Sequence, residues 1–288
     1  MEETTMVIDA HIRPALFEPI CKDKKRFEKR CDRMNYHLMS PSSIELLKKQ
    51  YALADIQKVF LIPSDCSFEL EEADISNSEI EQLVKYDSDF FIGFAAVNPM
   101  KENAEKELRR AFEEQGLRGL YINTARLHIY PYDKKLIPLY DICQQYNRPI
   151  IFQSGLSLEN NAFAKYCRPV DFEEVLYRYP DVNMCLTHVG WPWVQETASL
   201  LLKYKNCYTD TALMNFDGPY QIYKKVFTED MGKLWVEHNI ADKILFGSGS
   251  PRIRPVRSKR GLDSLGFSEE TLEKIYWKNA EDFLRQGE

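Results

Sequence analysis

Eight short apolar runs, each followed by a longer amphipathic and charged stretch, constrain the fold of this 288-residue chain more than any other feature. The runs are nearly continuous in hydrophobic residues, which is typical of strands buried on both faces of a parallel sheet. Alternation of such strands with amphipathic helices indicates repeated βα units. The runs occupy residues 6–8, 59–62, 90–97, 119–122, 149–152, 182–187, 207–209 and 243–246. The sequence therefore predicts an α/β fold, a single (β/α)8 barrel of the TIM type.

The length and composition of the chain agree with one domain over residues 1–288. A (β/α)8 barrel typically takes ~250 residues, and 44% hydrophobic residues are enough to fill its core. The segment 13–57 is interpreted as an insertion after the first strand that covers the barrel mouth, contacts a second subunit, or is a plain surface excursion. We predict helices at residues 104–115, 138–146, 172–179, 194–203 and 268–285.

Charge and cysteine content narrow the classes of partner. A net charge of -6 argues against a nucleic-acid surface, and the basic runs at 22–30 and 252–260 are interpreted as solvated faces. Seven cysteines without a CxxC pair predict reduced thiols and a cytoplasmic location. No stretch approaches the ~18 apolar residues of a membrane span, and residues 1–6 lack the pattern of a secretory leader. The expected partner is a small anionic or carboxylated molecule, and the insertion is compatible with a homodimer.

A polar residue follows nearly every apolar run. In a (β/α)8 barrel the chemistry takes place at the carboxyl ends of the strands, so these residues are the candidates for a ligand site. They are Asp9, His11, Arg13, Ser64, Asn98, Asn123, Gln153, Ser154, His188, Asp210, Ser248, Ser250 and Arg252.

Several stretches, in order along nearly the whole chain, resemble the amidohydrolase superfamily. They are VIDAH at 7–11, GLRGL at 116–120, PLY at 138–140, RPIIF at 148–152, THVG at 187–190, NCYTDT at 206–211, ILFGS at 244–248 and KNA at 278–280. The resemblance is to the branch that contains the aminocarboxymuconate-semialdehyde decarboxylases and the dicarboxylate lactonases. It implies a hydrolase or carboxy-lyase acting on a small carboxylated substrate, such as a lactone, an amide or a carboxylic acid.

The metal-binding pattern of that branch is incomplete in this sequence. Members carry a second histidine two residues after the first, a histidine closing strand five and an aspartate closing strand eight, where this sequence has Arg13, Gln153 and Gly249. A catalytic zinc site needs about three protein ligands, and a guanidinium at Arg13 would repel a cation. The resemblance therefore predicts a metal-independent site without a cofactor, and weak binding of a divalent metal such as zinc by His11 and His188 is the alternative.

Three residues are assigned to the chemistry. His188 is predicted to act as general acid or base, because histidine titrates near neutral pH; a structural hydrogen bond is the alternative. His11 either contacts the substrate or is a buried histidine bonded to Asp9. Arg13, together with Arg252 and Arg254, is predicted to clamp a carboxylate or polarise a carbonyl. The alternative is that Arg13 turns outward or pairs with a nearby carboxylate.

The remaining assignments concern substrate contacts. Gln153 can both donate and accept a hydrogen bond, and Trp191 either forms an aromatic wall or packs against the following helix. Asp210 is assigned a supporting role. The residues predicted to bind substrate are Gln153, Asn123, Trp191, Ser248 and Arg252.

Two functions from different classes follow. The first is an enzyme that hydrolyses or decarboxylates a small carboxylated substrate. The second is a non-catalytic barrel that binds a small anion or a protein partner. The second is favoured by Gly249, because the aspartate at that place in the superfamily usually handles the proton of the attacking water. No GxGxxG, Walker, HExxH or GxSxG motif supports a different chemistry.

Overall fold

The strands of the computed structural model form the predicted barrel. The structure describes residues 6–36, 39–65, 73–212 and 218–285, and within these each of the eight predicted runs overlaps one parallel strand. The strands are β1 (Val7–Ile12), β2 (Ile56–Leu61), β3 (Phe91–Gly93), β4 (Leu120–Ile122), β5 (Ile150–Phe152), β6 (Met184–Leu186), β7 (Cys207–Asp210) and β8 (Ile244–Leu245). The predicted (β/α)8 fold is confirmed.

Two single bridges close the barrel. The ladders form one sheet of β1 to β3 and a second of β4 to β8. The bridge between Ala95 and Leu120 joins β3 to β4, and the bridge between Ile12 and Ser250 joins β1 to the segment after β8. The pairing of β1 with β2 shifts register between Asp9 and Ile12, where His11 lies. Such an irregularity re-aims side chains at a strand end.

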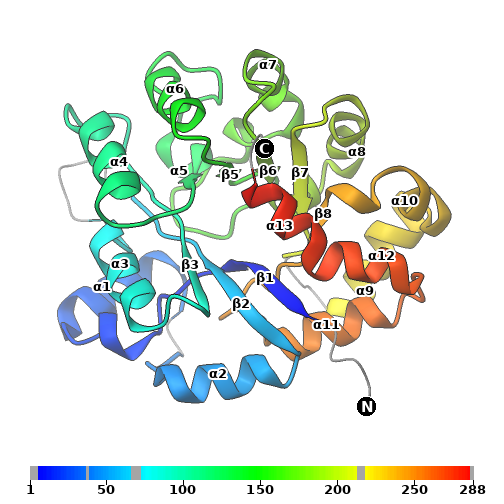
Figure 1. Cartoon of the computed structure of the whole chain (residues 1–288), viewed down its shortest axis with the longest axis horizontal. Helices are drawn as coiled ribbons and strands as arrows, with labels where there is room; N and C mark the ends of the chain where they lie inside the picture. Colours follow the sequence, from blue (N-terminus) through cyan, green and yellow to red (C-terminus); the bar gives the residue numbers. More distant parts are fainter. Residues whose placement is uncertain (1–5, 37–38, 66–72, 213–217, 286–288) are drawn as a thin grey trace.

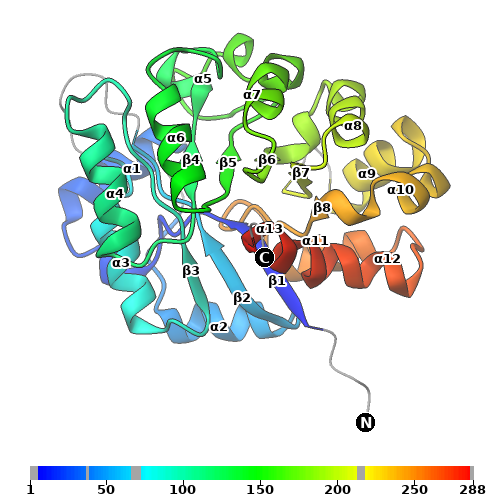
Figure 2. The same ribbon diagram turned by 45° about the horizontal axis from the view of Figure 1, so that its top comes forward.

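Helices surround the strands, as Figures 1 and 2 show. Each predicted helix is found, and the segment predicted as one helix at 268–285 is a continuous run of α12, a wider π-helical turn at Lys274–Lys278, and α13. Ser268 begins it by accepting a hydrogen bond from the Thr271 backbone N–H at 3.3 Å. The helices are α1 (Lys24–Arg33), α2 (Ile44–Ala52), α3 (Asn77–Tyr86), α4 (Ala104–Glu113), α5 (Thr124–Leu127), α6 (Ile137–Gln145), α7 (Glu173–Arg178), α8 (Val194–Lys203), α9 (Pro219–Tyr223), α10 (Lys233–Asn239), α11 (Pro255–Asp263), α12 (Glu269–Glu273) and α13 (Asn279–Leu284).

The barrel interior is a packed core that is closed at one end. Side chains from the strands, including Phe60, Tyr121 and Ile151, form a buried cluster with Ala280 and Phe283 of α13. Figure 1 shows α13 lying across the centre of the ring. Since α13 covers this end, a ligand can approach the interior at the opposite end, where the strands finish.

The segment between β1 and β2 is held beside the barrel mouth. It carries α1 and α2, and Arg30 of α1 is buried and bonded to Glu79 of α3 at 2.6 Å. The Asn35 side chain donates to the Leu158 carbonyl at 2.7 Å. This insertion therefore contacts the loop that follows β5.

The cysteines and helices of the described residues bear on the predictions about thiols and membrane spans. Six cysteines there carry free thiols, while Cys66 and residues 1–5 lie outside the described residues. Among the helices of the described ranges, none combines the length and apolarity that crossing a membrane requires.

Candidate functional site

A cavity of about 370 Å³ lies where the strands end. Most of the residues predicted to carry the chemistry meet there, because they follow different strands whose carboxyl ends share one rim of the barrel. The predicted site residues that line it are His11, Arg13, Gln153, His188 and Arg252. The other lining residues are Tyr36, Leu156, Ser157, Leu158, Glu159, Ala212, Gly249, Ile253 and Arg257.

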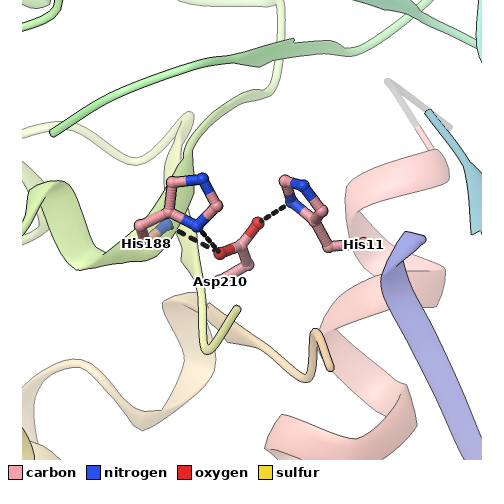
Figure 3. A group of neighbouring side chains, drawn as sticks. All are labelled: His11, His188 and Asp210. Carbon is pink, nitrogen blue, oxygen red and sulfur yellow. Dashed lines mark hydrogen bonds and ion pairs between the residues drawn. The ribbon is translucent and has the colours of Figure 1, made fainter. Parts of the chain in front are cut away.

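Asp210, at the end of β7, links the two histidines of the cavity. Its Oδ2 lies 2.7 Å from His11 Nδ1, and its Oδ1 accepts from the His188 backbone N–H at 2.7 Å. Figure 3 shows the two imidazole rings on either side of the carboxylate, with their centroids 5.0 Å apart. The His11 ring therefore bonds Asp210, whereas Asp9, the partner expected from the sequence, accepts from the His11 backbone at 3.2 Å.

The hydrogen bonds assign one tautomer to each histidine. A carboxylate and a carbonyl only accept, so Nδ1 of His11 donates to Asp210 and Nδ1 of His188 donates to the Ala212 carbonyl. In the neutral form of either ring, Nε2 then carries a lone pair. The lone pair of His188 Nε2 faces Gln153 Oε1, itself an acceptor, at 3.4 Å. A cation or a proton placed between these two acceptors would satisfy both of them.

Burial has a large effect on the pKa values of His188 and Asp210. Burial lowers the pKa of His188 to about 4, with smaller contributions from His11 and Arg13, and these outweigh the opposing effect of Asp210. His188 is therefore neutral at pH 7 and does not titrate near neutral pH, which the sequence-based assignment had assumed. Burial alone would raise the pKa of Asp210, but its interaction and hydrogen bond with His11 and the hydrogen bond from the His188 backbone hold it below its ordinary value.

The backbone at His188 is held in an unusual conformation. His188 and the following Val189 have φ values of 62° and 49°, in the left-handed region. Non-glycine residues adopt this region at a cost of order 1–3 kcal/mol, so the surrounding structure must hold them there. The bond from the His188 backbone N–H to Asp210 stabilises this turn.

Arg13 lies in the cavity wall. Its Nη2 donates to Tyr121 Oη at 2.5 Å, its Cζ lies 4.6 Å from the centre of the Tyr121 ring, and Nη2 is 3.2 Å from Glu159 Oε1. The side chain does not turn outward. It does pair with a carboxylate, which was the other alternative, and still faces the ligand space.

Glu159, in the loop after β5, is a charged wall residue that the sequence did not single out. Its Oε2 accepts from Arg126 Nη1 at 3.2 Å and from Asn123 Nδ2 at 3.1 Å. Asn123, predicted to bind substrate, does not line the cavity, because Glu159 stands between it and the open space. No spacing rule marks a carboxylate in a polar loop, so the sequence carried no signal for Glu159.

The other predicted contacts have different surroundings. Ser248 is buried, and its backbone N–H donates to Asp9 at 2.9 Å, which ties the segment after β8 to β1. Trp191 lines a separate surface hollow together with Trp193. Arg252 lines the cavity and donates to the Met34 carbonyl at 2.6 Å.

The loop that carries Glu159 depends on Gly155. Gly155 has a φ of +72°, and a Cβ there would lie 2.3 Å from the Trp191 carbonyl oxygen. We expect Gly155→Ala to lower the free energy of unfolding by about 3 kcal/mol, from strain plus overlap. Gly116→Ala is the matched control, because Gly116 has a φ of +67° with nothing within 4 Å of its Cβ position. Gly116→Ala should lower the free energy of unfolding by about 1 kcal/mol. Equal losses for the two variants in urea melts would refute the overlap at Gly155.

The donors in the cavity fit a divalent cation. His11, His188 and Asp210 each offer a ligand atom, and these atoms lie within 4.8 Å of one another. Histidines that bind metals usually donate their other ring N–H to a carboxylate or a carbonyl, as both do here. The guanidinium of Arg13 is balanced by Glu159. Its charge therefore does not exclude a cation from this cavity.

Comparison with known proteins agrees with this fold. An uncharacterised TIM-barrel protein of Bordetella bronchiseptica is 21% identical, with a TM-score of 0.76, and the match covers 97% of this chain and 98% of that one. A 5-carboxyvanillate decarboxylase of Novosphingobium aromaticivorans, with bound manganese, is 16% identical over 99% of this chain and 98% of its own, with a TM-score of 0.66. At these identities the likeness shows a shared fold.

A third similar structure also contains manganese. A dihydroxybenzoic acid decarboxylase of Polaromonas, also with bound manganese, is 16% identical over 97% of this chain and 96% of its own, with a TM-score of 0.64. No curated protein matches this chain.

The prediction of a site without a cofactor is wrong. Manganese in the related barrels points to a metal, and the group of His11, His188 and Asp210 can hold one. The prediction gave Asp210 a supporting role and left it out of the possible metal group. It also treated Arg13 as an unbalanced charge, because the pairing with Glu159 is not visible in the sequence.

The family is shown by the sequence itself. Residues 67–286 match the sequence model of the amidohydrolase family, which is more than half of the chain. The match takes in β3 to β8 and His188, whereas β1, β2 and His11 precede it. The chain therefore belongs to the amidohydrolase family and is an enzyme, a hydrolase or a carboxy-lyase.

Proposed function

We propose that this enzyme uses a divalent cation to decarboxylate a small carboxylated substrate in the cavity at the barrel mouth. The observation that carries the proposal is the position of Arg13, whose guanidinium lies in the same cavity wall as His11 and His188. A fixed cation beside a pair of metal-binding imidazoles suits a ligand that carries a carboxylate.

Arg13 would bind the substrate carboxylate. A guanidinium is planar and permanently charged, and it pairs with a carboxylate through two parallel hydrogen bonds. Tyr121 fixes its orientation by hydrogen bonding and by stacking. Arg252 and Arg257 line the same cavity and add to its positive charge.

Nε2 of His11 and Nε2 of His188 would hold the cation, and Asp210, which accepts the Nδ1–H of His11, would orient the rings. When bound, the metal supplies positive charge that polarises a substrate oxygen. Asp210 keeps the two rings in position by bonding the His11 ring and the His188 backbone. Gln153 lies against His188 and accepts a hydrogen bond from the Tyr121 hydroxyl at 3.3 Å. Since Tyr121 is also bonded to Arg13, Gln153 connects His188 to Arg13.

Decarboxylation is favoured over hydrolysis by the wall residues. In decarboxylation the bond between the carboxylate carbon and its neighbour breaks, carbon dioxide leaves, and a proton takes its place. Hydrolysis instead needs a base for the attacking water, yet Gly249 lies at the position of the family's acid and Glu159 is bound by two guanidiniums. The similar barrels from Novosphingobium and Polaromonas are named as decarboxylases, which supports the same choice.

His188 has two competing roles. The sequence suggested a general acid or base, but a neutral ring has one free lone pair, and a metal would use it. We retain the role of ligand, because a ring whose Nδ1 donates to a carbonyl is in the form that binds metals. In His188→Asn, a ligand role predicts loss of bound manganese, whereas an acid–base role predicts bound manganese without turnover.

The reaction itself can be tested on the full chain. Manganese-loaded protein is incubated with a panel of hydroxybenzoates and small lactones, and carbon dioxide release and lactone opening are measured. We expect carbon dioxide from a carboxylated compound, loss of this activity after chelation and its return with manganese. Lactone opening without carbon dioxide release would replace decarboxylation by hydrolysis, and the absence of bound manganese would contradict the proposal.

A further inference from the structure

Glu159 occupies the place of a carboxylate ligand. Its Oε1 lies 3.2 Å from Arg13 Nη2, and its Oε2 accepts from Arg126 at 3.2 Å and from Asn123 at 3.1 Å. Two guanidiniums and one amide thus converge on a single carboxylate whose side chain is 10% exposed. This set of donors is what a site for a bound carboxylate would contain.

The donors belong to the barrel, whereas the carboxylate belongs to a loop. Arg13 directly follows β1, and Asn123 and Arg126 lie at the start of α5, directly after β4. Asn123 Oδ1 also accepts from the Arg126 backbone N–H at 3.1 Å, so these two residues are fixed relative to each other. Glu159 lies in the loop after β5 and lines the cavity, and rotation of its side chain would leave the donors in place.

The charges around this position favour exchange of one anion for another. Behind Arg126, Asp74 Oδ2 lies 3.7 Å from its Nη2, and this partner remains when Glu159 moves away. Arg13 then faces the cavity beside Arg252 without the carboxylate of Glu159. Buried charges are costly unless they are paired, so a carboxylate from the ligand would restore the balance.

We propose that Arg13, Arg126 and Asn123 form a carboxylate subsite, which Glu159 fills in the free enzyme and vacates when a substrate carboxylate enters. The inference rests on the proposed function, because it takes the ligand to be the carboxylated substrate. It gives Asn123 and Arg126 direct contact with that ligand. It also makes Glu159 an internal competitor that the substrate must displace.

The test measures benzoate binding to the full chain by calorimetry. Glu159→Gln keeps the size of the side chain and removes its charge, so the competitor is weakened. We expect benzoate to bind about tenfold tighter, a modest fraction of the coupling measured for close charge pairs. In Glu159→Asp the side chain is one methylene shorter, so its carboxylate lies farther from Arg13, and this variant should also bind benzoate more tightly. It replaces Glu159→Gln in the test if that variant does not fold. Unchanged or weaker binding would overturn the subsite, since a purely bracing role predicts weaker binding.

Controls separate the subsite from a general effect of charge. Glu196→Gln removes a carboxylate that pairs with Arg168 outside the cavity, and it should leave benzoate binding unchanged. Benzamide, the neutral analogue, should not respond to Glu159→Gln. Adding Asn123→Ala to Glu159→Gln should remove most of the gain, whereas a general increase in positive charge would preserve it and refute the subsite.

The outcomes also distinguish this inference from the proposed function. If Arg13→Gln leaves benzoate binding to the enzyme unchanged, the carboxylate clamp itself fails. If Arg13→Gln weakens benzoate binding and Glu159→Gln weakens it as well, the clamp stands and only the displacement of Glu159 is refuted.

Discussion

Replacing Arg13 with glutamine is expected to weaken the binding of benzoate by about 100-fold and to reduce turnover at least as much. Truncating one partner of a buried, hydrogen-bonded charge pair costs about 2–5 kcal/mol, and glutamine has no charge to offer a carboxylate. Arg13 is buried in the cavity wall, so water would not replace the lost contact fully. The measurement is calorimetry with benzoate, followed by steady-state kinetics on the substrate found in the panel.

Two variants control this prediction. Arg254→Gln makes the same change at an exposed arginine at the start of α11 and should leave benzoate affinity unaltered. Arg13→Lys keeps the charge but cannot make two parallel hydrogen bonds, so an intermediate loss is expected. Full benzoate affinity in Arg13→Gln would show that the carboxylate binds elsewhere.

Replacing Asp210 with asparagine is expected to lower manganese affinity by about 100-fold, the upper end of what loss of a partner of metal ligands costs. Asp210 accepts from the His11 ring and from the backbone N–H groups of His188 and Ala212. An asparagine would turn an NH2 group toward at least one of these donors. We also expect a loss of about 2–4 kcal/mol in the free energy of unfolding.

Manganese retention and urea melts measure both effects. Asp87→Asn is the matched control, because Asp87 pairs with Lys48 away from the cavity. It should leave manganese retention unchanged. If Asp210→Asn kept its manganese and its stability, the group of His11, His188 and Asp210 would not be the metal site.

The barrel could be predicted because its signal is local. A parallel strand buried on both faces needs a short apolar run, and each such run, for example 149–152 at β5, overlaps a strand. Residues that follow strands were brought together for the same reason: Arg13, Gln153 and His188 meet because strand ends share one rim. Topology therefore placed them without any knowledge of loop structure.

The rest of the site depends on contacts between residues far apart in the chain, which no local sequence pattern predicts. Glu159 reaches Arg13 only because the loop after β5 folds back over the mouth, where Asn35 from the insertion holds it. The sequence therefore showed Arg13 as an unbalanced cation and argued against a metal. Asp210 was placed at a strand end correctly, but its bond to His11 comes from the close approach of β7 to β1 across the barrel rim.

The central claim is that one cavity binds a carboxylate at Arg13 and a divalent cation at the histidines. The most direct test is calorimetric titration of benzoate into wild type and Arg13→Gln, each with and without manganese. The account predicts the tightest binding in manganese-loaded wild type, with a clear loss when either Arg13 or manganese is removed. Equal benzoate affinity in all four states would contradict it.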